Sequence, residues 1–130
     1  MVFDFYDWNG VRVLECAAQG DTIRTVADAI ALLEKAIEHQ ANWLVIPAAR
    51  LDPAFFQLRT GIAGEITQKF VLYGYKLAIV GDISQFTQES KALRDFILEC
   101  NRGRDIWFLA DTAELEDRLS RRPSDSTPQV

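Results

Sequence analysis

The residues best suited to chemistry lie in one polar, glycine-containing segment near the middle of the chain. It begins Arg59-Thr60-Gly61, and Gly64 and Glu65 follow within the next helical turn. A threonine hydroxyl ahead of a predicted helix caps the first free N–H groups, and a helix N-terminus also favours a bound or covalent phosphate. We therefore interpret Thr60 as a helix N-cap, with a phosphorylation site or a small-anion contact as the alternative. Arg59 adds a guanidinium that binds carboxylates or phosphates.

The side chains around this segment form a candidate binding surface for a partner protein. Glu65, Gln68 and Lys69 share one helix face through their spacing of three and four. Such a face is solvated by default, with a Glu–Lys pair, and a protein interaction surface is the alternative. Of the adjacent Phe55 and Phe56, we expect one ring to enter the core and Phe56 to remain as an anchor for a partner.

Two further features of the segment are less specific. Arg94 lies on a later predicted helix and would close over Thr60 if the two helices were neighbours. Gly61 and Gly64 form a GxxG pattern, but the chain has neither GxxxxGK[ST] nor GxGxxG, which phosphate-binding loops use. We expect the two glycines to allow close packing of the helix against its neighbour.

Other catalytic or metal-binding chemistries find little support in the sequence. His39 is the only histidine, and no CxxC, HxH or HExxH pattern occurs, so we expect no metal and no cofactor. Cys16 and Cys100 are far apart and are expected to be reduced thiols. Asp82 and Asp111 follow predicted parallel strands, at the edge where α/β sheets bind ligands. We expect them to be loop and cap residues, and a small-ligand protein or enzyme using this edge is the alternative function.

Alternating strands and helices must position these residues. Asn9-Gly10 between two apolar runs predicts a β-hairpin over 3–16. Apolar runs typical of strands buried on both faces follow at 43–46, 76–80 and 106–109. Helical spacing is found at 25–39, 61–73, 90–101 and 111–119. The order ββαβαβαβα predicts an α/β fold, in which a single mixed, mainly parallel sheet carries the hairpin at its edge and helices cover it.

Local patterns fix the ends and the faces of these elements. Thr25 with Asp28 three positions later predicts a helix start of the capping-box type. Val26, Ile30, Leu33 and Ile37 recur with helical spacing after it, and we expect this stripe to face the core. A short helical turn is expected after Asp52-Pro53, because aspartate caps a helix and proline suits its first position.

Length and composition favour a single α/β domain over 1–120 and a disordered tail over 121–130. The chain has 130 residues, of which 48% are hydrophobic and 25% charged. Its net charge of −5 argues against nucleic acid and anionic membranes as partners. The first residues lack the pattern of a signal peptide, and no apolar run is long enough to span a membrane. We expect a cytoplasmic protein.

Three stretches carry a resemblance to a known family: Phe55–Phe70, Lys76–Asp82 and Leu93–Ile97. Together they resemble a bacterial family of small proteins catalogued as domain of unknown function 4180. The resemblance extends over nearly the whole chain, up to about Leu119, and implies kinship without implying an activity.

The order of elements is more distantly similar to that of STAS domains, the fold of bacterial anti-sigma-factor antagonists. Those proteins carry a Ser or Thr followed by Gly at the head of the helix after a buried strand, and phosphorylation of that hydroxyl switches a kinase-like partner. The resemblance implies this role for Thr60-Gly61, although Leu58-Arg59 stands where the antagonists have an acidic residue and a second hydroxyl. We therefore expect a non-enzymatic, STAS-like regulatory module that binds a protein or a small anion. A homodimer through the hairpin edge or Phe56 stays open.

Overall fold

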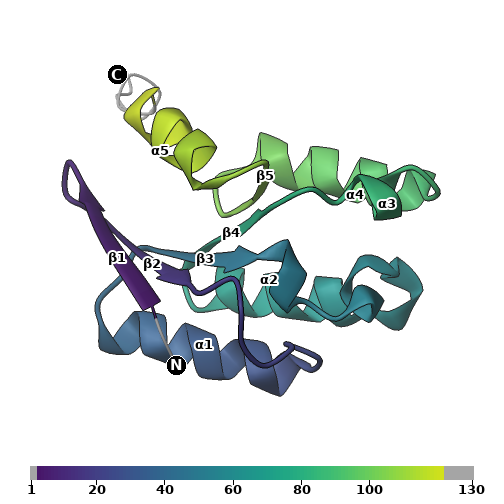
Figure 1. Cartoon of the computed structure of the whole chain (residues 1–130), viewed down its shortest axis with the longest axis horizontal. Coiled ribbons are helices and arrows are strands. Elements are labelled where there is room, and N and C mark those ends of the chain that lie inside the picture. The colour runs from purple at the N-terminus through teal and green to yellow at the C-terminus, as the bar shows by residue number, and fades with distance from the viewer. Residues whose placement is uncertain (1–2, 122–130) are drawn as a thin grey trace.

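The chain opens with the predicted hairpin, in which β1 (Phe3–Trp8) pairs antiparallel with β2 (Val11–Cys16). Asn9 and Gly10 make the turn with φ of 54° and 88°, the positive values that such a two-residue turn requires. This computed structural model describes residues 3–121, shown in Figure 1. The expected tail is therefore largely outside the described residues, and Arg121 ends the last helix.

Three parallel strands extend the hairpin into a five-stranded sheet, in the order β1-β2-β3-β4-β5. The added strands are β3 (Trp43–Pro47), β4 (Lys76–Val80) and β5 (Ile106–Leu109). The helices are α1 (Val26–Glu38), α2 (Ile62–Leu72), α3 (Ser84–Thr87), α4 (Lys91–Arg102) and α5 (Thr112–Arg121). Three 3-10 turns separate β3 from α2: η1 (Ala48–Arg50), η2 (Pro53–Phe56) and η3 (Leu58–Thr60). The predicted α/β class and mixed, mainly parallel sheet are confirmed.

Both faces of the sheet are buried, as the apolar runs predict. One face packs against α1, α2 and α4 and contains Phe55, Phe70 and Leu93. The other face packs against α5 through Leu115, and there the Trp43 and Trp107 rings lie 4.6 Å apart. Within residues 3–121, none of the helices combines the length and the apolar content needed to cross a membrane.

Helix α1 starts at the predicted capping box but faces the core differently from the prediction. Thr25 Oγ1 accepts from the N–H of Asp28, whose carboxylate accepts from the N–H of Thr25. The side chains buried against the sheet are Ala29, Leu32, Leu33 and Ala36. Ile37 is 43% exposed, so its predicted place in the core is wrong. Of the predicted stripe, Leu33 is buried, and the core face also takes in Ala29, Leu32 and Ala36.

Candidate functional site

A groove lies beside the carboxyl ends of β3 and β4, between the segments that follow these strands. The side chain of an aspartate holds the start of each segment. Asp52 Oδ1 accepts from the N–H of Ala54 at 2.9 Å and starts η2, as predicted. Asp82 Oδ1 accepts from the N–H of Ser84, the first residue of α3, at 2.9 Å, and Ile83 occupies the N-cap position. These two hydrogen bonds set the directions of the segments that form the groove walls.

Two stacked aromatic rings form the floor of the groove. Phe56 and Phe86 have ring centroids 4.4 Å apart and an angle of 9° between their planes. Phe55 meets Phe56 edge to face at 5.0 Å. Phe55 and Phe56 are 1% and 3% exposed, so the prediction of Phe56 as an exposed anchor is wrong. The reason is α3, which the sequence pattern did not reveal and which lays Phe86 over the ring of Phe56.

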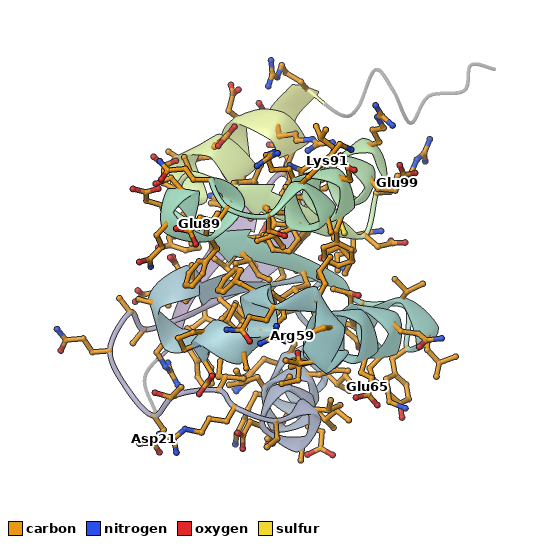
Figure 2. All side chains as sticks on the ribbon, turned by 90° about the vertical axis from the view of Figure 1, so that its right-hand side faces the viewer. Asp21, Arg59, Glu65, Glu89, Lys91 and Glu99 are labelled. Atoms are coloured by element: carbon orange, nitrogen blue, oxygen red, sulfur yellow. The ribbon has the colours of Figure 1, made fainter. Side chains whose placement is uncertain are left out.

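The groove encloses about 460 Å³ and has oppositely charged side chains in its lining. Arg59 extends from η3 on one side, and Glu89 precedes α4 on the other; both are exposed and labelled in Figure 2. Within the part of the chain that the structure describes, neither forms an ion pair or a side-chain hydrogen bond. The full lining is Phe56, Gln57, Leu58, Arg59, Gln85, Phe86, Glu89, Ser90 and Ala92.

Thr60 holds the Arg59 side of the groove together. Its Oγ1 lies 2.9 Å from the carbonyl oxygen of Ala54 and 2.8 Å from that of Gln57, to which the hydroxyl donates. The same oxygen accepts a longer contact, at 3.3 Å, from the N–H of Ile62. Thr60 is the last residue of η3 and Gly61 occupies the N-cap position of α2, so the predicted N-cap assignment is one residue off. The hydroxyl mainly ties η2 to η3.

The two glycines of the GxxG pattern do not serve close packing. A Cβ added at Gly61 or Gly64 would meet nothing within 4 Å, which makes the packing prediction wrong. Gly61 is explained by its φ of 79°, a conformation that L side chains rarely adopt. Gly64 has an ordinary helical backbone and lies exposed in the first turn of α2. Nothing in the packing of the chain itself accounts for a glycine there.

The remaining predicted site residues lie outside the groove lining. Glu65 and Gln68 are exposed on α2 and Lys69 is half-buried; across residues 3–121 no ion pair joins Glu65 to Lys69. Arg94 does not close over Thr60. Its Nη1 donates to the carbonyl oxygens of Thr87 at 2.6 Å and Gln88 at 3.4 Å, and so holds α3 against α4. Arg94 therefore positions the Glu89 side of the groove.

A second hollow of about 480 Å³ lies at the sheet edge itself and shares Gln85 and Phe86 with the groove. Asp82 is the one ionisable side chain among its described lining residues. Hydrogen bonds from Ser84 hold the pKa of Asp82 below its usual value. Asp111 caps α5 by accepting from the N–H of Glu114 at 2.8 Å. Asp82 is a loop residue and Asp111 a cap residue, in line with the prediction.

Thiol and metal chemistry have no assembled site in the described chain. Burial raises the pKa of Cys16 to about 12 and that of Cys100 to about 11, so both free thiols stay protonated at neutral pH. His39 packs against Phe5 with ring centroids 5.1 Å apart, at the end of α1. Over residues 3–121, no three His, Cys, Asp or Glu side chains gather in a way that could hold a metal ion.

Sequence reasoning missed the Glu89 side of the groove, and only a weak local signal could have shown it. Asp82 stands two residues before Ser84, in the same relation as Asp52 to Ala54. Reading both as caps would have indicated a second short helical turn, carrying Phe86.

Comparison with known proteins identifies a family but no function. The model of the family described as Domain of unknown function (DUF4180) matches residues 8–119, a range that includes the whole groove. No curated protein and no solved structure matches the chain.

Proposed function

The chain belongs to the family described as domain of unknown function (DUF4180), and we propose that it is a non-enzymatic regulatory module whose groove receives a segment of a partner protein. One observation carries the proposal. Arg59 and Glu89 extend from the two sides of a groove with an aromatic floor, and neither is used by the described part of the chain itself. Charged groups without an internal partner beside an apolar surface favour specific recognition of a complementary chain.

The lining defines the chemistry of the segment that fits. The half-buried Phe86 ring, stacked on the buried Phe56, receives an apolar or aromatic side chain. Arg59 pairs with a carboxylate of the partner, and Glu89 with a lysine or arginine on the other side. Gln57 and Gln85 offer amide groups for hydrogen bonds to a peptide main chain. The partner segment is therefore a short peptide with an apolar residue between an acidic and a basic one.

The same lining favours binding over catalysis. Its ionisable members are Arg59 and Glu89, and a guanidinium does not serve as a general base at neutral pH. The Ser90 hydroxyl accepts from the N–H of Leu93 at 3.1 Å, where it caps α4. At the sheet edge, the carboxylate of Asp82 already holds the N–H of Ser84. Within residues 3–121, no hydrogen bond joins the Ser90 hydroxyl to the Glu89 carboxylate, so the lining shows no nucleophile activated by a base.

The regulatory part of the proposal rests on Thr60. The hydroxyl donates its proton to the carbonyls of Ala54 and Gln57. A phosphoryl group on Oγ1 would remove that proton and set negative charge beside two carbonyl oxygens. Phosphorylation would then separate η2 from η3 and displace Arg59, a switch of the kind that the likeness to STAS domains implies.

Peptide selection tests the binding function. A displayed library of random peptides is screened against the wild-type chain, and the selected peptides are titrated calorimetrically against Arg59→Glu and Glu89→Lys. We expect each reversal to weaken binding about tenfold or more, because it puts like charges together. Arg104→Glu and Glu34→Lys are matched controls at exposed positions outside the groove and should bind like wild type. Selected peptides that bind the groove variants as tightly as wild type would contradict the proposal.

A further inference from the structure

The two edge strands of the sheet, β1 and β5, differ in whether their outward main-chain groups are hydrogen-bonded. At the β5 edge, the side chain of Asn101 acts like a neighbouring strand. Its Oδ1 accepts from the N–H of Phe108 at 2.7 Å, and its Nδ2 donates to the carbonyl of the same residue at 3.2 Å. This pair of bonds occupies the main-chain groups that would otherwise attract a further strand.

The outer edge of β1 has no such cover within residues 3–121. Arg12 lies opposite Asp7 in the hairpin, and the main-chain groups of Arg12 point towards β3. Its N–H donates to Asn42 Oδ1 and its carbonyl oxygen accepts from the N–H of Asn42, both at 2.7 Å. Asp7 and Arg12 are thus a non-hydrogen-bonded pair of the hairpin, and the main-chain groups of Asp7 point outwards. Because hydrogen-bonded and non-hydrogen-bonded pairs alternate along the hairpin, the main-chain groups of Phe5 and Phe3 also point outwards. No hydrogen bond within the described chain uses these outward groups.

An exposed aromatic ring marks the middle of this edge. Phe5 is 53% exposed, although it is a large apolar residue in a regular strand. A hollow of about 380 Å³ lies beside it, lined by Phe5, Tyr6, Asp7, Arg12 and His39. Strand β1 has no proline and an unbroken pairing register with β2, so neither proline nor a bulge interrupts the edge from Phe3 to Trp8, although Asp4 and Asp7 add charge to it. The edge therefore presents both free main-chain groups and apolar surface.

We propose that β1 pairs antiparallel with β1 of a second copy of this chain, with Phe5 opposite Phe5 across a two-fold axis. The pairing joins the two sheets into one and is self-complementary, as a two-fold interface must be. It is independent of the groove and of the function proposed for it.

Charge and apolar contact select this alignment. With Phe5 opposite Phe5, each Asp4 faces Tyr6 and each Asp7 faces Phe3 of the other copy, so no carboxylates oppose each other. If one β1 strand slides along the other so that Asp4 lies opposite Asp4, the two carboxylates repel each other. If the strands slide by the same amount the other way, Asp7 of each copy lies opposite Phe5 of the other, and the exposed Phe5 ring no longer packs on a second Phe5 ring. Only the central alignment avoids both costs.

Charge exchange at position 5 tests the dimer. Light scattering of the wild-type chain over a concentration series should show a rise from monomer to dimer mass. Phe5→Glu and Phe5→Lys should each raise the dimer dissociation constant about tenfold or more, because like charges then meet at the axis. An equimolar mixture of the two variants should dimerise again. Leu72→Glu and Leu72→Lys are matched controls at a position that is 70% exposed on α2, and they should dimerise like wild type.

Cross-linking provides a second measurement that does not depend on charge. A hydrogen-bonded antiparallel pair has Cα atoms about 5.5 Å apart, within disulfide range. Mild oxidation should link Phe5→Cys into a covalent dimer much faster than Asp4→Cys, which reports the shifted alignment. A wild-type chain that stays monomeric at every concentration would overturn the proposal. A dimer that survives in both Phe5 variants, a mixture that does not re-associate, or faster linking of Asp4→Cys would do so equally.

Discussion

The rings of Phe56 and Phe86 stack nearly parallel, 4.4 Å apart, although the two residues follow different strands of the sheet. Each stands four positions after an aspartate whose side chain accepts from the main chain two residues on, Asp52 in one case and Asp82 in the other. The two segments meet through these rings. The stack sets the separation of Arg59 from Glu89, on which the proposed recognition depends.

Energetic coupling between these rings is the first prediction. Phe56→Leu and Phe86→Leu should each destabilise the fold, and the double variant should lose less than the sum by about 0.5–1.5 kcal/mol, the value of an aromatic pair beyond its burial. Urea denaturation of the four proteins measures this coupling. Phe56→Leu combined with Phe5→Leu is the control, because those rings do not touch, and its effects should add. Additive losses for Phe56 and Phe86 would show that the stack does not join the two segments.

The hydroxyl of Thr60 is the second test. Thr60→Val keeps the shape but removes the donor to the carbonyls of Ala54 and Gln57, and should cost about 0.5–1.5 kcal/mol of unfolding free energy. Thr60→Ser retains the donor and should cost markedly less. Chemical denaturation measures both variants. A Thr60→Val variant as stable as wild type would show that the hydrogen bonds of the hydroxyl do not stabilise the fold.

The two glycines of α2 should respond in opposite directions. Gly64→Ala should raise the unfolding free energy by about 0.5–1 kcal/mol, because the helical position is open and alanine reduces the entropy of the unfolded chain. Gly61→Ala should lower it by about 1–2 kcal/mol, because φ there is 79°. Thermal melts of both variants measure the two signs. A destabilised Gly64→Ala variant would reveal a packing role that the structure does not show.

Acid sensitivity should depend on the capping box of α1. Main-chain N–H groups of Arg24 and Thr25 donate to Asp28 and hold the pKa of its carboxyl below the usual value. Because the folded pKa lies below the unfolded one, the carboxylate stabilises the fold above about pH 4 and this contribution is lost as the pH falls further. Denaturation curves should therefore show wild type and Asp28→Ala converging at low pH. A difference between wild type and Asp28→Ala that stays constant down to low pH would contradict this role of the carboxylate.

Features set by short-range physics could be predicted from the sequence. Asn9-Gly10 adopts positive φ in any tight hairpin, and the capping box of Thr25 and Asp28 needs only neighbouring atoms. The run from Trp43 to Pro47 is buried at every residue because a central parallel strand is covered on both faces.

The predictions that were wrong depend on contacts between residues that are far apart in the sequence or on the backbone conformation of a neighbour. Helix α3 has four residues, too few to show a period, and its packing of Phe86 on Phe56 joins segments that are 30 positions apart (86 − 56). Thr60 has the residue type of an N-cap, but the left-handed backbone of Gly61 takes that position. The orientation of α1 is set by its packing on the sheet and α2, which buries Ala29, Leu32, Leu33 and Ala36 and leaves Ile37 at the end of the predicted stripe exposed.

Mapping the contact surface of a selected peptide by amide chemical shifts tests the central claim most directly. With labelled wild-type chain, we predict that the largest changes fall on both sides of the groove, at Gln57 and Arg59 and at Gln85 and Glu89. At the same subsaturating peptide concentration, they should be clearly smaller for Arg59→Glu. Changes concentrated at the sheet edge around Ala48 and Gly81 would favour a small-ligand site there. Changes confined to any surface away from Arg59 and Glu89 would contradict the assignment of the groove as the binding site.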